Sequence, residues 1–83
     1  MRDQKLYLKD IVAAIDSIFS FVAGMDLETF QGDDKTVSAV LRKFEVMGEA
    51  AKRIPEPFRQ QYPHIPWKDM ASMRDRLIHF YFG

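Results

Sequence analysis

The sequence predicts an all-α fold, and its periodicity and its proline positions support that class. Two long segments repeat apolar residues at the spacing of one helix face. The prolines fall between residues 55 and 66, outside both segments. No internal repeat or low-complexity tract is present. We therefore expect residues 1–83 to form a single helical bundle, with two long antiparallel helices followed by short C-terminal helices.

Composition and charge exclude several classes of protein. The chain has 83 residues, of which 47% are hydrophobic and 29% charged, so it can bury one modest core that self-association would reinforce. Twelve basic and twelve acidic residues balance, and no long-range field marks a general nucleic-acid or membrane binder. The absence of cysteine excludes disulfides and thiolate chemistry. No stretch resembles a signal peptide or a membrane span, so we expect a soluble, cytoplasmic protein without membrane contact.

The first helix is expected from Lys5 to about Ala23. Polar residues recur along one side of it, while the opposite arc is apolar: Leu8, Ile11, Val12, Ile15, Ile18, Phe19 and Val22. This arc is wider than one packing partner needs. We therefore expect part of it to be exposed in a single chain and covered in a homodimer.

Aspartate-containing turns precede the next two helices. Asp26 is expected to cap a short helical turn in "DLETF", and Asp33 or Asp34 a second long helix. The apolar residues of that second helix step at helical spacing: Val37, Val40, Leu41, Phe44, Met47, Ala51 and Ile54. Gly48 lies inside this helix, where glycine costs about 1 kcal/mol against alanine. We expect it to permit the close approach of another backbone.

Prolines divide the C-terminal third of the chain. "PEP" at residues 55–57 ends the second helix, because proline has no N–H to donate and restricts the residue before it. "PFRQQY" is expected to form a short helical turn and "PHIP" an extended connector. Pro66 is expected as the first residue of a final helix that contains Trp67, Met70, Met73, Leu77 and Phe80.

The last segment, "RDRLIHFYFG", holds the candidate functional residues Arg74, Asp75, His79 and Tyr81. Asp75 and His79 are four apart, close enough on a helix for the carboxylate to orient the imidazole. Arg74 and His79 differ by about 140° around an ideal helix. They could converge on one ligand if the helix begins or kinks near Arg74, if the arginine wraps round, or if a symmetry mate supplies half of the site.

An arginine and a histidine near one ligand would suit metal-independent RNA cleavage. The guanidinium neutralises phosphate oxygens, and the imidazole moves protons to or from a ribose hydroxyl or a leaving oxygen. The alternative is structural: Arg74 would lie in a surface ion pair, with His79 satisfied by Asp75. Spacing alone favours the structural alternative.

The pattern of the whole chain nevertheless resembles one known family. The C-terminal motif is Arg74 and, after four residues, His79 and, after one more, Tyr81. It follows "IPWKDMASM" and, further upstream, "AVLRKFEVMGEAAKRI" and "YLKDIVAAI". In order and spacing, these segments are similar to the HepT-like toxins of the HEPN superfamily. Such toxins normally continue past the tyrosine into another helical stretch, so a member that is short at its C-terminus is expected.

That resemblance implies an all-helical homodimer and an endoribonuclease that needs neither metal nor cofactor. The arginine and histidine of two protomers would form a composite site at the dimer interface. By position, Arg74 would stabilise the scissile phosphate, His79 would be the general acid and base, and Asp75 would support them. The resemblance also implies a toxin–antitoxin system. A minimal nucleotidyltransferase antitoxin, MntA-like, would bind the toxin and attach AMP to Tyr81. The competing hypothesis is a catalytically idle helical dimer that binds the nucleotidyltransferase.

Other conspicuous residues are given structural interpretations. Trp67 is expected to pack in the core or at a corner, the methionines to fill gaps, and His64 to be a surface or structural residue. The outer charges of the second helix are expected to form ordinary solvated pairs: Arg42, Glu45, Glu49 and Arg53. Glu45 and Glu49 lack a histidine ligand nearby, so no metal site is expected there. No glycine-rich phosphate loop is present.

Overall fold

The structure is a computed structural model that describes residues 3–82, with the side chains of residues 3–80. Every regular element in that part of the chain is a helix: α1 (Gln4–Val22), α2 (Leu27–Gln31), α3 (Asp34–Arg53), α4 (Glu56–Gln61) and α5 (Trp67–Phe82). The predicted all-α class is confirmed, and so are both long helices.

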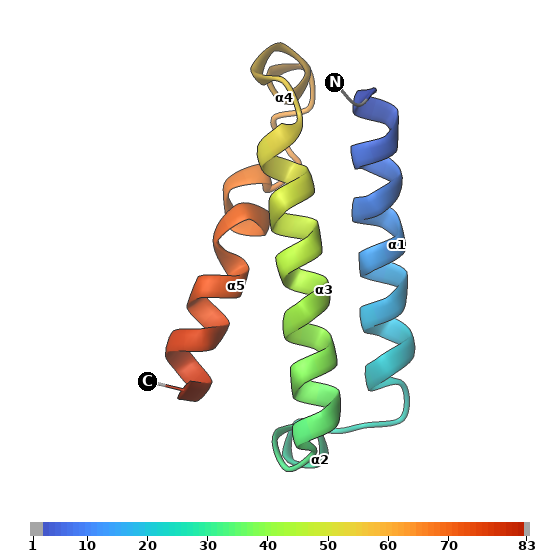
Figure 1. Ribbon diagram of the computed structural model, residues 1–83, viewed down its shortest axis with the longest axis vertical. Coiled ribbons are helices and arrows are strands. Elements are labelled where there is room, and N and C mark those ends of the chain that lie inside the picture. Colours follow the sequence, from blue (N-terminus) through green and yellow to red (C-terminus); the bar gives the residue numbers. More distant parts are fainter. Residues whose placement is uncertain (1–2, 83) are drawn as a thin grey trace.

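The central element is α3, which packs against α1 on one side and α5 on the other (Figure 1). Both flanking helices run antiparallel to α3. The short α2 lies at the end where α1 passes into α3, and α4 lies at the opposite end, where α3 passes into α5 (Figure 1). Because α3 contacts both neighbours, its sequence determines where each of them sits.

Aspartate side chains cap the first three helices. Asp3 accepts a hydrogen bond from the Lys5 N–H at 2.9 Å, and Asp26 accepts one from the Thr29 N–H at 2.8 Å. Asp33, rather than Asp34, caps α3 and accepts the Thr36 N–H at 3.1 Å. These bonds satisfy N–H groups that have no partner within the first turn. The backbone hydrogen bond from Thr36 also lowers the pKa of Asp33 below its usual value.

Prolines divide the chain at the other end of the bundle, as expected, but residues 63–66 contain a turn, closed by a hydrogen bond from the Ile65 N–H to the Tyr62 carbonyl, and do not form the expected extended connector. Ile54 ends α3 in an extended conformation before Pro55, and α4 follows directly. The last helix begins at Trp67, one residue later than expected. The carbonyl of Pro66 accepts the Met70 N–H at 3.0 Å, so the proline contributes to the first helical hydrogen bond from just outside α5.

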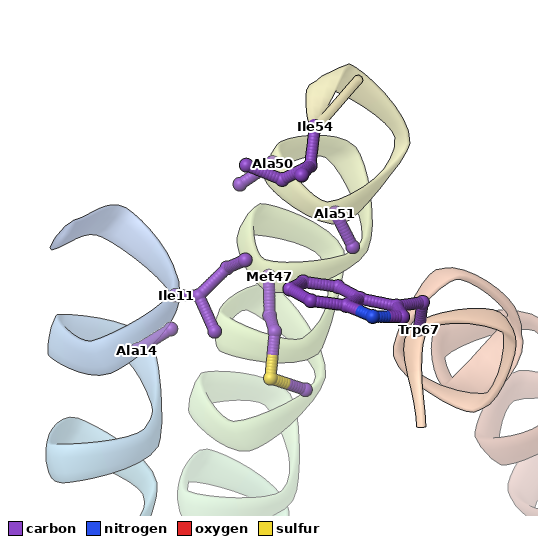
Figure 2. Packing of buried hydrophobic residues seen from close by; sticks show 7 residues of the cluster. All are labelled: Ile11, Ala14, Met47, Ala50, Ala51, Ile54 and Trp67. Atoms are coloured by element: carbon purple, nitrogen blue, oxygen red, sulfur yellow. The ribbon is translucent and has the colours of Figure 1, made fainter. Parts of the chain in front are cut away.

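The core lies where the start of α5 meets α1 and α3. Its side chains come from all three helices and their ends: Ile11, Ala14, Met47, Ala50, Ala51, Ile54 and Trp67 (Figure 2). The Trp67 indole is 8% exposed, and its Nε1 donates to the Tyr62 carbonyl at 3.0 Å. The predicted packing role of Trp67 is confirmed, because burial of its ring is accompanied by a partner for its only polar atom.

An apolar groove of about 450 Å³ lies between α1 and the start of α5, and we call it the α1–α5 groove. Its lining is apolar throughout: Leu8, Ile11, Val12, Ile15, Met47, Ile65, Pro66, Trp67 and Met70. Val12 is 58% exposed and Phe19, further along α1, is 69% exposed. The apolar arc of the first helix is therefore only partly covered within one chain, as its width predicted.

Candidate active site

The close crossing of α3 and α5 at Gly48 positions the candidate site. A Cβ on Gly48 would lie 3.1 Å from the Met70 carbonyl oxygen and 3.3 Å from that of Ala71. The expected close approach of a second backbone is therefore confirmed. Because the helices are antiparallel, residues one turn from the crossing face each other: Glu45 precedes Gly48 on α3, and Arg74 follows Ala71 on α5.

Arg74 is held at this crossing by two carboxylates. Its Nε lies 2.8 Å from Oε2 of Glu45 in an ion pair, and its Nη1 donates to Oδ1 of Asp75 at 3.1 Å. The other oxygen of Glu45, Oε1, accepts from Nη1 of Arg42. Glu45 therefore bridges two arginines on different helices, so the expectation that it would form only an ordinary solvated pair along α3 was incomplete.

The two arginines favour the ionised form of Glu45. The hydrogen bond from Arg42 is the main cause that lowers the pKa of Glu45 below its usual value. Burial opposes this effect as the second-largest cause, and the positive charge and hydrogen bond of Arg74 each lower the pKa further by a smaller amount. The carboxylate therefore keeps its charge, and its hold on both guanidinium groups, into acidic solution.

A polar depression of about 300 Å³ opens beside these groups. Arg42, Glu45, Gly48, Arg74 and Asp75 contribute to its lining. The side chain of Arg74 is 43% exposed, so solvent reaches the guanidinium while two of its nitrogens are held. Such an arrangement can bind an anion, since a guanidinium has five N–H donors and the carboxylates engage only two of its nitrogens.

His79 lies away from Arg74 on the same helix. Because α5 extends from Trp67 to Phe82, Arg74 sits within it, and the option that the helix begins there is excluded. Five helical residues separate the two side chains by ~7.5 Å along the axis and ~140° around it. His79 is exposed. The structure does not bring Arg74 and His79 together on one face of a single chain.

The expected contact between Asp75 and His79 is not formed. Asp75 accepts from Arg74 instead, and among the described side chains His79 has no hydrogen bond. The physical reason is that the guanidinium of the adjacent Arg74 is always positive and has several N–H donors within reach of this carboxylate. The remaining candidate, Tyr81, has its backbone in α5, but its side chain lies outside the described residues.

Sequence reasoning missed Glu45 as a partner of Arg74. A signal was available, because Glu45 lies three residues before Gly48 and hence on the same face of α3. A charged residue beside a glycine crossing is well placed to reach the approaching helix. What the sequence could not supply was which turn of α5 would lie opposite.

The fold and this cluster define a small all-α protein with a solvent-accessible arginine site. The chain belongs to the HepT-like ribonuclease family, which its residues 11–83 match. It is 50% identical over 82 residues to a Methanocaldococcus jannaschii protein named "Putative RNase MJ0125", covering 99% of this chain and 71% of that relative. It is also 50% identical over 82 residues to "Probable ribonuclease HepT" of Thermococcus cleftensis, covering 99% and 74%.

The predicted resemblance is thereby confirmed, and the family supports a ribonuclease function. No solved structure gives a significant match. Within the part of the chain that the structure describes, no helix combines the length and the apolar character needed to cross a membrane.

Proposed function

We propose that this chain is a metal-independent endoribonuclease that cleaves RNA with Arg74 and His79. The observation that carries the proposal is the Arg74 guanidinium, held at two nitrogens and open to solvent beside a polar depression. Membership of a ribonuclease family and the relatives named as RNases support the same function. An exposed arginine alone would suit many anions, so the family narrows the anion to an RNA phosphate.

The proposed chemistry needs only charge and proton transfer. Arg74 binds the non-bridging oxygens of the scissile phosphate and stabilises the charge that develops there. His79 removes the proton of the ribose 2′-hydroxyl, whose oxygen forms a new bond to phosphorus. The bond from phosphorus to the 5′ oxygen breaks, and the imidazolium returns the proton to that oxygen. The products are a 2′,3′-cyclic phosphate and a 5′-hydroxyl.

The helix geometry supports a composite site in a homodimer. Since Arg74 and His79 differ by about 140° around α5, one chain does not present both to the same phosphate. In the proposed dimer, His79 of one protomer faces Arg74 of the other. The α1–α5 groove and the exposed Val12 and Phe19 supply the apolar area that such association would cover. Sedimentation of a stable monomer at micromolar concentration would contradict this arrangement.

We also propose a toxin–antitoxin context, with a minimal nucleotidyltransferase as antitoxin. In the modification step, the Tyr81 phenol oxygen bonds to the α-phosphorus of ATP, pyrophosphate leaves, and the phenol proton passes to solvent. The attached AMP would add bulk and negative charge to the end of α5 that also carries His79, and this charge would repel RNA. Intact mass after incubation with ATP and the partner should show one AMP increment that Tyr81→Phe removes. An increment that persists in Tyr81→Phe would place the modification elsewhere.

The deciding experiment incubates purified protein with labelled RNA in EDTA, beside an Arg74→Ala and His79→Ala double variant. Cleavage by the parent alone, with 2′,3′-cyclic phosphate ends, would support the proposal. If neither protein cuts any RNA offered while both bind the nucleotidyltransferase, the idle helical dimer is the better description. Cleavage by both proteins would assign the activity to other residues or to a contaminant.

A further inference from the structure

We infer that Glu45 is a positioning residue for Arg74, holding one edge of the guanidinium so that another edge faces the phosphate. This inference rests on the proposed function and adds a residue of α3 to a site otherwise carried by α5. Glu45 touches neither the RNA nor the reacting atoms in this scheme. It acts through the 2.8 Å ion pair between its own Oε2 and Nε of Arg74.

The contacts of Arg74 divide its nitrogens into held and open ones. Nε is paired with Glu45 and Nη1 with Asp75, and Nη2 has no partner among the described residues. Nη2 and the second N–H of Nη1 therefore remain for an anion, which matches the paired donors that a guanidinium presents to phosphate. A phosphate can bind there without displacing Glu45.

Glu45 fixes Arg74 relative to the bundle in a way that Asp75 cannot. Asp75 is next to Arg74 on α5, so it moves with the arginine whenever that helix shifts. Glu45 belongs to α3, and its second oxygen is held by Arg42 of the same helix. The crossing at Gly48 holds the two helices close one turn away. Arg74 is thus attached to the central helix α3 through Glu45, whose carboxylate is itself held in place by Arg42.

A competing role for Glu45 predicts the opposite result. If its carboxylate neutralised Arg74 and had to be displaced by RNA, removing its charge would increase phosphate binding and activity. The geometry favours positioning, because the contact is made at Nε while the side chain of Arg74 remains 43% exposed. The two roles are separated by the sign of the change in activity.

The test compares Glu45→Ala and Glu45→Gln with the parent and with Glu56→Gln. The control removes a carboxylate of similar type, one that accepts from Arg59 at 2.6 Å in α4, outside the proposed site. We expect Glu45→Ala to lower kcat about 10- to 100-fold with a smaller change in KM, since misplacement of a catalytic group by ~1 Å can cost that much. Glu45→Gln should retain part of the activity, because its amide oxygen still accepts from Nε. Glu56→Gln should match the parent.

Coupling to Arg74 separates positioning from a general structural role. In an Arg74→Ala background, Glu45→Ala should cause no further loss, because the group that it positions is already absent. A further loss of equal size there would show that Glu45 stabilises the fold, and would overturn the inference. Parent-level or increased activity of Glu45→Ala, with the activity of Arg74→Ala still reduced, would overturn it as well.

A readout without RNA keeps the inference testable if the parent does not cut RNA. The Nε–Hε NMR signal of Arg74, assigned by its loss in Arg74→Ala, should show slow exchange with water in the parent. Exchange should become at least about tenfold faster in Glu45→Ala and stay unchanged in Glu56→Gln, because the first change removes the carboxylate that lies 2.8 Å from Nε and shields its hydrogen from water. Fast exchange in the parent would show that Glu45 does not hold Arg74. An inactive parent with slow exchange would count against the proposed function alone.

Discussion

The two ends of α5 are built for different tasks. At its start, Trp67 is 8% exposed and packs against residues of α1 and α3 in the core (Figure 2). Near its end, His79 is exposed and Phe80 is 71% exposed, and the helix lies apart from α3 (Figure 1). Arg74 lies between the two ends, tied to α3 by Glu45. One helix can thus be anchored by packing at one end and leave the other end available for chemistry.

Replacement of His79 tests whether the exposed end of α5 carries catalysis without contributing to stability. His79→Ala should lower RNA cleavage by about a hundred- to ten-thousand-fold, the usual cost of losing a general acid or base. Its free energy of unfolding should change by less than about 0.5 kcal/mol, because the side chain is exposed and has no described hydrogen bond. Labelled-RNA cleavage and urea unfolding on the same preparation check both parts. A variant that unfolds would instead assign His79 a structural role.

At the start of α5 we expect a large loss of stability. Trp67→Ala should destabilise the protein by about 3–5 kcal/mol, the range for truncation of a large buried aromatic side chain. That loss is comparable with the whole stability of a small domain. Phe80→Ala is the matched change at the exposed end and should cost less than about 0.5 kcal/mol. Urea midpoints of dilute protein measure both, and equal losses would contradict the division of α5 into two ends.

The close contact of α3 and α5 at Gly48 lies between the two ends of α5 and can be tested separately. Gly48→Val should destabilise the protein by about 1–3 kcal/mol, because its side chain must displace the backbone of Met70 and Ala71. Gly32→Val is the control: a Cβ there would meet nothing closer than 3.5 Å, so a change below about 0.5 kcal/mol is expected. Thermal unfolding followed by circular dichroism compares them. Similar midpoints for the two variants would mean that α5 can move away from α3 at little cost.

The smallest expected effect concerns the dependence of stability on pH. The folded-state pKa of Glu45 is lowered by Arg42 and Arg74, so the unfolded chain binds this proton first as the pH falls. The stabilisation is therefore fully present above the usual pKa of 4.5 and is lost as the pH falls through the lowered value. Glu45→Gln should remove this part of the acid dependence. Unfolding of parent and variant between pH 6 and pH 3 measures it, and parallel curves would show that the pair contributes nothing.

The fold could be predicted from the sequence because its determinants are local. Asp26 and Asp33 mark helix starts through bonds to residues three positions ahead, and Pro55 ends α3 whatever lies around it. Gly48 likewise predicted a close approach, since a glycine inside a helix is costly unless another backbone needs the space. Such signals depend on few neighbours, so they can be interpreted without the tertiary structure.

The candidate site was less predictable because its contacts cross between helices. Asp75 could pair with His79 by its spacing, yet it accepts from Arg74. Glu45 belongs to an i, i+3 pair with Arg42, and only the register of α5 against α3 shows that Arg74 joins it. Where a side chain could contact either a local or a distant partner, tertiary packing determines which contact forms. Periodicity gives the face of a helix but not the turn that will lie opposite.

The α1–α5 groove affects the calorimetry of this protein. Of its lining residues, Val12 and Ile15 stay 58% and 36% exposed in the folded monomer, so their side chains add less to the heat-capacity change of unfolding than buried ones would. We therefore expect the monomer to fall below the usual ~12–15 cal/mol/K per residue, with a flatter curve of stability against temperature. If association covers the groove, its surface becomes hydrated only when the protein dissociates and unfolds, and this hydration then contributes to the heat-capacity change. The heat-capacity change should then rise with protein concentration, which would reveal the covered surface without a structure of the complex.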